Sequence, residues 1–431
     1  MSKSQVSTVR SALKSALSAD EVNQLGRRCG QSERLRTVTP HRLFLAIVAA
    51  LAGARVESLA DLLREFNAQN KTTTAYKAFY NRLARAGFAE FMREMLCRLL
   101  GALALRILEA EAGSVLSAFD DIVIHDGSSF ALKDALRQAY PGRFTTVDPA
   151  AVELHATFSG FEDNVITVAL AADKEAERQF LPEPGELRNK LLLADRGYPS
   201  LKYFVDLCRA GASFIVRLTR SYDPWVLCCF AKGKPHPLRR PLRLCQFLSQ
   251  HQGCPLDLEV EFRRGKRVHR FRLVVLPGKE KGMTRLCTNL DRQRFPLELV
   301  AKLYRFRWQV ELCFKEWKSY ANLHRFDTAN EHIAEGLIWA SLCAACLKRF
   351  LAHAAQLVGG GVPMSTRRVA MCARHVIGLL FAALLHGVRR LASVLDDALR
   401  FLLANARRAH PKRDRETGRL RAGLVVVAVL K

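Results

Sequence analysis

The stretch "YRFRWQVELCFKEWKSY", residues 304–320, carries four reactive side chains at helical spacing. Tyr304, Arg307, Glu311 and Lys318 follow one another at intervals of three, four and seven residues. At about 100° per residue, they fall within an arc of roughly 60° on one helix face. A core-facing stripe is normally apolar, and a solvated one normally pairs opposite charges. A single carboxylate beside a phenol and two cations instead suits a metal ion next to a phosphate.

Two more carboxylates stand where short apolar runs are expected to end as strands. "IVIHDG" ends in Asp126 and "LLLADRG" in Asp195, each followed closely by glycine. A carboxylate at a strand end, with a glycine that lets the chain turn away, is placed to reach into an open cleft. With Glu311 these residues make an all-oxygen ligand set, which suits Mg²⁺ or Mn²⁺ rather than zinc. Two such ions serve phosphodiester chemistry by activating a water or hydroxyl and stabilising the leaving oxygen.

Each carboxylate also has a purely structural interpretation. Asp126 is compatible with a turn, Asp195 with a helix cap, and Glu311 with a partner for an i,i+4 cation. The Asp-Gly context favours Asp126 over the acidic residues just before it. His125 and His155 are weaker candidates for a base, because strand alternation points His125 away from its neighbour.

Between residues 119 and 218 the pattern is that of a mixed α/β sheet. "FDDIVIHDGSS", "VELHATFSGF" and "NVITVALAAD" are strand-like, and "SGFED" suits a hairpin turn between the last two. "LLLADRGY", preceded by a helical stretch, and "ASFIVRLTR" are the later strand-like runs. Strands that pair early and then alternate with helices predict a mixed sheet flanked by helices.

These patterns divide the chain into five segments. Residues 1–115 are predicted to be a helical DNA-binding region, where three short helices fit a helix-turn-helix unit and a plain bundle equally well. Residues 116–218 and 296–360 are predicted to be two parts of one α/β core. Residues 219–295 read as a β insertion with 17 Lys and Arg against 6 Asp and Glu. Residues 361–431 are predicted to be helical to about residue 408, followed by a basic tail.

The composition indicates a folded protein that binds an anionic partner. The 67 Lys and Arg against 41 Asp and Glu give a net charge of +26, which points first to nucleic acid and second to a membrane surface. The most apolar stretches, 338–347 and 376–385, are too short to span a bilayer. The twelve cysteines lie mostly in apolar runs, which favours reduced core thiols. We therefore predict a cytoplasmic, nucleoid-associated protein with no membrane partner.

Taken together, these residues resemble a known family. Tyr304-x2-Arg307-x3-Glu311-x6-Lys318 reproduces the Y-R-E-K signature of bacterial DDE transposases of the insertion-sequence-four family. "HDGSS" resembles the first-Asp motif of that family, and "LLADRGY" closely resembles the second. The order of the motifs and the long insertion before the glutamate also match, over roughly residues 40–350.

The resemblance implies a ribonuclease-H-like catalytic core interrupted by the β insertion. In that core Asp126, Asp195 and Glu311 would be the catalytic residues and would hold two Mg²⁺ or Mn²⁺ ions. The reaction implied is cut-and-paste transposition, in which metal-dependent strand cleavage and strand transfer proceed without a covalent protein–DNA intermediate.

The resemblance also implies how DNA is held. Tyr304, Arg307 and Lys318 would contact DNA phosphates near the cleaved end, the arginine through its bidentate fork and the lysine as a point charge. The partners implied are double-stranded DNA, as transposon ends with inverted repeats and as target, and a second copy of the chain in a synaptic homodimer.

Two other functions stay open at this point. One is a metal-dependent nuclease that hydrolyses DNA without strand transfer, and the other is a DNA-binding repressor derived from a transposase. The chain also departs from relatives that form a DNA hairpin, which carry a tryptophan on the last strand of the insertion. Here that stretch reads "KGMTRLCTNL", so Met283 or the more distant Trp225 would have to contact a flipped base.

Overall fold

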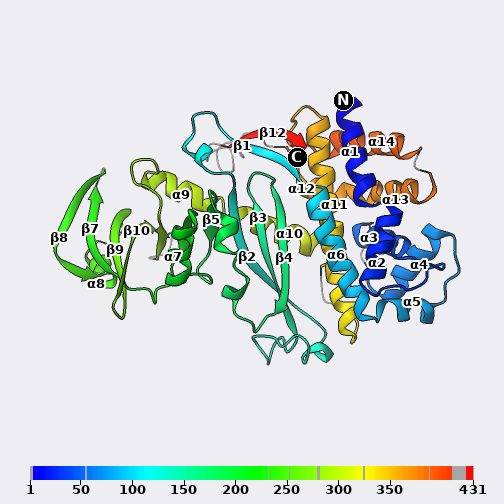
Figure 1. Cartoon of the computed structure of the whole chain (residues 1–431), viewed down its shortest axis with the longest axis horizontal. Helices are drawn as coiled ribbons and strands as arrows, with labels where there is room; N and C mark the ends of the chain where they lie inside the picture. The colour runs from blue at the N-terminus through cyan, green and yellow to red at the C-terminus, as the bar shows by residue number, and fades with distance from the viewer. Residues whose placement is uncertain are drawn as a thin grey trace.

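The computed structural model describes residues 3–53, 56–231, 233–251, 253–278, 282–323, 326–387, 389–409 and 424–430. They form an elongated molecule in which a β-sheet lies between two dissimilar ends (Figure 1). One end is helical and holds the N-terminus, and the other holds the strands and one short helix within residues 225–277. The sheet in between carries the residues that the sequence singled out.

The core of the sheet is mixed, as predicted. A central strand is flanked on one side by two antiparallel strands and on the other by two parallel strands. The order is β4-β3-β2-β5-β6, with β2 at the centre. This arrangement, flanked by helices, is the ribonuclease-H-like α/β class expected from the resemblance, and the prediction is confirmed. The strands are β2 (Ile122–Ala131), β3 (Ala151–Ser159), β4 (Asn164–Ala172), β5 (Leu191–Ala194) and β6 (Ser213–Arg217).

Strand β5 is buried on both faces because each face has its own layer of helices. Leu191 and Leu193 pack into the same core cluster as α10 (Trp308–Tyr320) and α11 (Glu331–Val358). Leu192 instead packs with α7 (Leu201–Ala210) on the opposite face. A parallel strand that is covered by helices on both faces requires apolar residues at every position, and β5 has four in succession.

The basic insertion continues the sheet of the core. Its strand β11 (Met283–Thr288) pairs antiparallel with β6, with Leu286 opposite Arg217. The order then runs β11-β10-β9-β7-β8, so ten strands form one sheet. The other elements of the insertion are β7 (Trp225–Ala231), β8 (Lys234–Arg243), α8 (Leu244–Gln250), β9 (Leu256–Arg264) and β10 (Arg267–Pro277).

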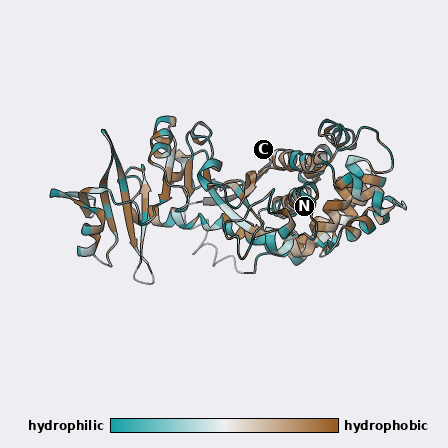
Figure 2. Ribbon diagram, turned by 90° about the horizontal axis from the view of Figure 1, so that it is seen from below, coloured by the Kyte–Doolittle hydropathy of each residue, from teal (hydrophilic) through white to brown (hydrophobic). Residues whose placement is uncertain are grey.

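The helical end is built around α11. Twenty-four of its side chains are buried, and it packs against α6 (Ala86–Ala102) and α3 (Pro40–Gly53). Among the described residues it is the one single helix with the length and apolarity to cross a membrane, but 94% of the apolar window lies inside the protein. Figure 2 shows hydrophobic residues gathered in this part and along the strands. The other helices are α1 (Lys3–Ala16), α2 (Ala19–Arg28), α4 (Leu59–Asn70), α5 (Tyr76–Leu83), α12 (Thr366–Cys372), α13 (Ile377–His386) and α14 (Leu391–Asn405).

Two local expectations from the sequence were wrong, and part of a third lies outside the described residues. Strand β1 (Leu105–Ala110) interrupts the predicted N-terminal helical segment and pairs with β12 (Leu424–Leu430), which follows the predicted basic tail. The helical stretch expected before β5 consists of two short 3₁₀ turns, at Glu177–Phe180 and Pro184–Leu187. Residues 410–423 of the predicted tail lie outside the described residues.

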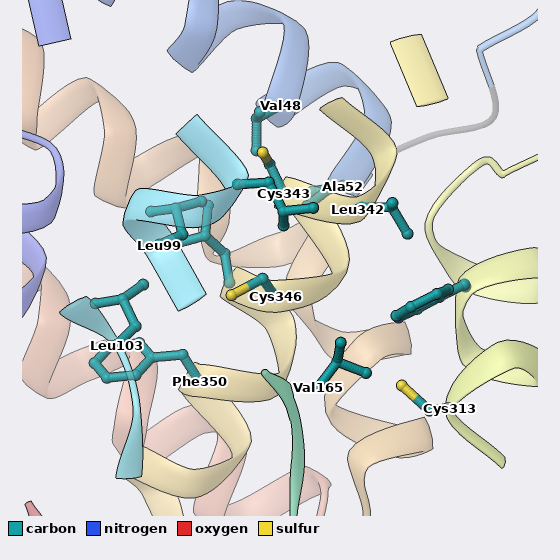
Figure 3. Close-up of a cluster of buried hydrophobic side chains, with 14 of the residues drawn as sticks. Val48, Ala52, Leu99, Leu103, Val165, Cys313, Leu342, Cys343, Cys346 and Phe350 are labelled. Atoms are coloured by element: carbon teal, nitrogen blue, oxygen red, sulfur yellow. The ribbon is translucent and has the colours of Figure 1, made fainter. Parts of the chain in front are cut away.

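The Cys-x-x-Cys pair of α11 belongs to the hydrophobic core. Figure 3 shows Cys343 and Cys346 among apolar side chains such as Leu99 and Phe350. All twelve cysteines are free thiols. Burial raises the pKa of Cys346 to about 12, which keeps this thiol protonated and unsuited to binding a metal. The prediction of reduced core thiols fits this pair, whereas Cys97 and three other cysteines are exposed.

A buried ion-pair network joins the helical end to the sheet. The guanidinium of Arg349, on α11, lies 3.1 Å from a carboxylate oxygen of Asp163 in the β3–β4 turn and 2.8 Å from Glu316 on α10. Its Nε also donates to the carbonyl of Asp163. Three elements that are distant in the sequence are thereby held by one side chain.

We predict that Arg349→Met lowers the free energy of unfolding by about 3–5 kcal/mol, because the change leaves buried carboxylates without their cation. Chemical denaturation followed by circular dichroism measures the loss. The matched control is Arg400→Gln, which removes an exposed i,i+4 pair with Asp396 and should cost less than about 0.5 kcal/mol. Equal effects of the two substitutions would contradict the structural role of Arg349.

Candidate active site

The two aspartates lie side by side because of the parallel pairing of β2 and β5. The last parallel pair is His125 opposite Ala194, and Asp126 and Asp195 are the next residues on the two strands. Only Asp195 follows a strand end. The expectation that Asp126 also ends its strand was wrong, because β2 continues to Ala131 through its pairing with β3.

The glycines near the aspartates provide space. Neither Gly127 nor Gly197 has a positive φ, so the expected turning role is not what these positions require. A Cβ at Gly127 would clash with the carboxylate of Glu153, and one at Gly197 would clash with that of Glu177. Both glycines therefore let acidic side chains approach the aspartate-bearing segments closely.

The Y-R-E-K stretch forms two helices, not the single helix expected. Tyr304 lies near the end of α9 (Leu297–Arg305), and Glu311 lies in the first turn of α10. Between them Phe306 and Arg307 keep right-handed helical dihedrals, but their backbone hydrogen bonds run to the third residue before them. This 3₁₀-type tightening ends one helix and starts the next without a glycine or proline.

All six predicted side chains nevertheless face the same region of the sheet. The hydroxyl of Tyr304 donates to Asp195 Oδ1 over 3.0 Å. The guanidinium of Arg307 bridges two carboxylates, with Nη1 2.5 Å from Asp126 Oδ2 and Nη2 2.6 Å from Glu311 Oε1. The structure thus brings carboxylates from β2, the end of β5 and α10 around one tyrosine and one arginine.

Lys318 lies farther along α10. Its ammonium donates to the backbone carbonyl of Ser129 on β2 over 2.8 Å, and the side chain is exposed. This contact fixes the lysine at the edge of the cleft without neutralising it. The Lys318 ammonium therefore stays available to an anion.

Burial is the main influence on the charge of the carboxylate cluster. Burial raises the pKa of Asp126 to about 6, with Asp195 and Glu311 adding to the rise and Arg307 opposing it. Burial also raises the pKa of Tyr304 well above its usual range, and the nearby Asp195 adds to this. Tyr304 is therefore a neutral hydrogen-bond donor at physiological pH. The cluster is one in which added positive charge is favourable.

The three carboxylates fit a divalent cation, but in this structure the guanidinium of Arg307 supplies the positive charge between two of them. Three carboxylates converge, and oxygen donors are the ligands that Mg²⁺ and Mn²⁺ prefer. Within the described ranges, however, no three His, Cys, Asp or Glu side chains are close enough to form a ready metal cluster. Because the guanidinium bridges Asp126 and Glu311, metal binding requires Arg307 to release at least one of them.

One charged neighbour of the site was missed from the sequence. Arg217 is the last residue of β6, and its Nη1 lies 3.6 Å from Asp195 Oδ1. The β5–β6 register pairs Ala194 with Val216, so Asp195 and Arg217 are the residues that come next. Arg217 could have been predicted from the sequence, because it also stands at the end of an apolar, strand-like run.

The two histidines considered as bases are buried and uncharged. His125 and His155 stack in parallel with ring centroids 6.5 Å apart. Burial lowers the pKa of His125 to about 3 and that of His155 to about 4. His125 donates or accepts one hydrogen bond with Thr157, on the neighbouring strand β3. These contacts make the pair part of the support beneath Asp126.

The mixed sheet and a matching family model identify the protein as a DDE-type enzyme. The chain belongs to the DDE transposase family, since the family model "Transposase DDE domain" matches residues 117–347. It is 19% identical to the transposase for insertion sequence element IS231B of Bacillus thuringiensis subsp. berliner, over 90% of this chain and 89% of that protein. Over 66 residues it is 39% identical to the putative transposase InsL of IS186A from Escherichia coli K12, covering 15% of this chain and 18% of the relative.

A solved structure of a piggyBac transposase synaptic complex with hairpin DNA is also similar. It has 10% sequence identity and a TM-score of 0.45, and the match covers 91% of this chain and 85% of that chain. The family assignment makes the protein a transposase, an enzyme that acts on DNA and depends on divalent metal.

We predict that Arg307→Gln strengthens binding of Mn²⁺ to the DNA-free protein by about tenfold, because it removes a competing cation; tenfold is about 1.4 kcal/mol. Isothermal titration at pH 7.5 measures this affinity. Lys318→Gln is the matched control, since Lys318 contacts a carbonyl and no carboxylate among the described residues. Unchanged Mn²⁺ affinity in Arg307→Gln would show that the guanidinium does not compete with metal.

Proposed function

We propose that this transposase binds the terminal inverted repeats of its element and performs cut-and-paste strand cleavage and strand transfer. The observation that supports this most directly is the convergence of Asp126, Asp195 and Glu311 from three separate elements. In this proposal they hold two Mg²⁺ or Mn²⁺ ions. When bound, these ions supply activation of the attacking water or 3′-hydroxyl and stabilisation of the leaving oxygen.

The protein's own groups divide the remaining tasks. Arg307 moves from the carboxylates to a phosphate of the cleaved strand, where its planar fork binds two oxygens. Tyr304 orients Asp195 through its hydrogen bond, and its aromatic ring faces the DNA. Lys318 adds a point charge at the edge of the cleft. The role of Arg307 is thus double, because the same guanidinium stabilises the cluster before DNA arrives.

The assembly proposed is a homodimer on paired DNA ends, acting in the cytoplasm and associated with the nucleoid. We also retain the five-segment division of the chain, with the helical N-terminal segment as a DNA-binding region. The described helices α3 to α5 in that segment accommodate either a helix-turn-helix unit or a plain bundle. No membrane partner is part of the proposal.

We predict that Asp126→Asn, Asp195→Asn and Glu311→Gln each abolish nicking of an end duplex in Mg²⁺ while retaining most of the binding. Each substitution removes one ligand charge with little change of shape. Denaturing gels measure nicking, and mobility shifts measure binding. Near-normal nicking by any one variant would remove that residue from the catalytic set.

Strand transfer separates the proposal from its nuclease alternative. Wild-type protein is given pre-cleaved ends, Mg²⁺ and a supercoiled target plasmid. Joined products support transposition, whereas hydrolysis without joining would identify a nuclease. Binding to the ends without any cleavage would instead support a repressor.

The basic insertion offers a second DNA-contacting surface at the β9–β10 turn. Lys266 and Arg267 are exposed there. Arg263, by contrast, is engaged with Glu261 over 2.7 Å and lies over the ring of Trp225 at 5.2 Å. Arg243 lies 5.0 Å from the same ring. Two guanidinium contacts on Trp225 leave Met283 as the better of the two candidates considered for contacting a flipped base.

We predict that the double variant Lys266→Gln/Arg267→Gln lowers the slope of log affinity against log salt by up to about 1.8, at about 0.9 per phosphate contact. Fluorescence anisotropy on an end duplex, measured over a series of salt concentrations, gives the slope. Arg64→Gln, an exposed cation paired with Asp61, is the charge-matched control. An unchanged slope in the double variant would mean that this turn is merely solvated.

A further inference from the structure

A second cleft adjoins the carboxylate site at the far end of α10. It has a volume of about 510 Å³ and lies where α10, α11 and α12 meet the end of α3. Lys318 belongs to its lining and is also the residue that touches β2 beside the carboxylates. One lysine therefore links this cleft to the strand that carries Asp126. The other lining side chains include Tyr320, Asn322, Lys348, Met371 and Arg374.

The charge of this cleft is one-sided. Lys318, Lys348 and Arg374 contribute three cations, and none of the described lining residues is acidic. In the part of the chain that the structure describes, none of the three has a carboxylate within salt-bridge distance. Arg349 provides the contrast, since it is next to Lys348 in the sequence and contacts both Asp163 and Glu316. The protein thus neutralises one buried cation and leaves its neighbour unmatched.

Lys348 is the most deeply buried cation of this cleft. Only 5% of this residue is exposed, and its ammonium donates to the backbone carbonyl of Tyr320. Burial lowers the pKa of Lys348 to about 8. A buried ammonium that is not paired is costly, and a bound anion would offset that cost.

The walls of the cleft are fixed before any ligand binds. Asn322 donates to the carbonyl of Leu51 over 2.7 Å, which ties the end of α10 to α3. Arg367, on α12, donates to the hydroxyl of Tyr320 over 2.9 Å and adds a further cation beside the cleft. A preformed site with several cations is suited to a repeating anion.

We propose that this cleft holds the phosphate backbone of the DNA strand that continues from the cleaved phosphodiester, with Lys348 and Arg374 as phosphate-binding residues. Lys318 follows Glu311 by seven residues, which is about 10 Å along a helix. A duplex strand rises about 3.4 Å per nucleotide along its axis and also winds round that axis, so Lys318 marks a phosphate at most about two nucleotides from the carboxylates. Lys348 and Arg374 contact phosphates beyond it.

This inference rests on the proposed function, since it takes the carboxylates as the place of cleavage. It adds the direction in which the DNA strand runs from the carboxylates, which is toward α11 and α12 and away from the insertion. The end that continues past Lys318 is therefore held by the helical part of the protein. DNA on the other side of the cleaved bond is left to the basic insertion.

The test is a scan of single uncharged phosphates in an end duplex, without divalent metal so that binding is measured apart from cleavage. Methylphosphonate replaces one phosphate at a time, and affinities are compared for wild type, Lys348→Gln and Arg374→Gln. We expect each variant to bind about tenfold more weakly than wild type. We also expect each to lose no further affinity when its own phosphate, which lies beyond the one that Lys318 contacts, is neutralised. Arg400→Gln, which removes one exposed charge elsewhere, should show the wild-type pattern.

The outcomes are distinct. Arg374 is exposed, so Arg374→Gln keeps the test valid if Lys348→Gln fails to fold. The inference would be overturned if, in a folded variant, the loss of affinity from the substitution and the loss from the neutralised phosphate simply added at every position. The inference would also be overturned if inorganic phosphate competed with the duplex while no single neutralised phosphate changed the affinity. That result would indicate a site for free phosphate. If the wild-type protein does not bind the end duplex at all, the proposed function is wrong. If it binds and nicks the duplex but no single phosphate changes the affinity, only the present inference is wrong.

Discussion

Carboxylates from three elements lie close together in this protein, and a cation lies between two of them. Asp126 and Glu311 both contact the guanidinium of Arg307, and Asp195 is approached by Arg217 and Tyr304. Without these partners the negative charges would repel one another at low solvent exposure. The bridge also explains the tight turn at Phe306 and Arg307, since it lets one arginine reach a strand and a helix together.

A second, largely buried set of charges keeps these carboxylates in place. Glu316 lies on α10, five residues beyond Glu311, and contacts Arg349 of α11, which also holds Asp163 in the β3–β4 turn. The helix that carries the glutamate is thereby anchored to the sheet that carries the aspartates. Catalytic geometry in such a site depends on support from the surrounding side chains. The Asp163–Arg349–Glu316 network provides it from the side opposite to the insertion.

Much of the candidate site could be predicted because its chemistry imposes residue types at fixed spacing. The spacing of Tyr304, Arg307 and Glu311, together with one Asp-Gly and one Asp-x-Gly context, located side chains that the structure brings together. Their assignment as catalytic and DNA-binding residues stays a prediction. The mixed sheet followed from apolar runs that pair early and then alternate with helices. These features are local, so one sequence is enough to find them.

The features that were missed depend on partners distant in the sequence. Strand β2 continues past Asp126 because β3 is there to pair with it, and no local signal marks the difference. The break between α9 and α10 occurs without Gly or Pro, through a shift of hydrogen bonds alone. Strand β12 is different, because "LVVVAVL" at 424–430 is rich in valine and its signal was present in the sequence.

The continuous sheet gives the basic insertion a mechanical connection to the carboxylates. Leu286 of β11 pairs with Arg217, and Arg217 approaches Asp195, so a single strand register relates the insertion to one of the aspartates. A flexible linker would let the basic surface move independently of the cleft. Backbone pairing along β6 and β11 does not allow this freedom, because a slip of one residue would turn Arg217 to the other face. In the proposed function, DNA held by the insertion would be presented to the carboxylates in a fixed orientation, which is what cleavage at one defined phosphodiester requires.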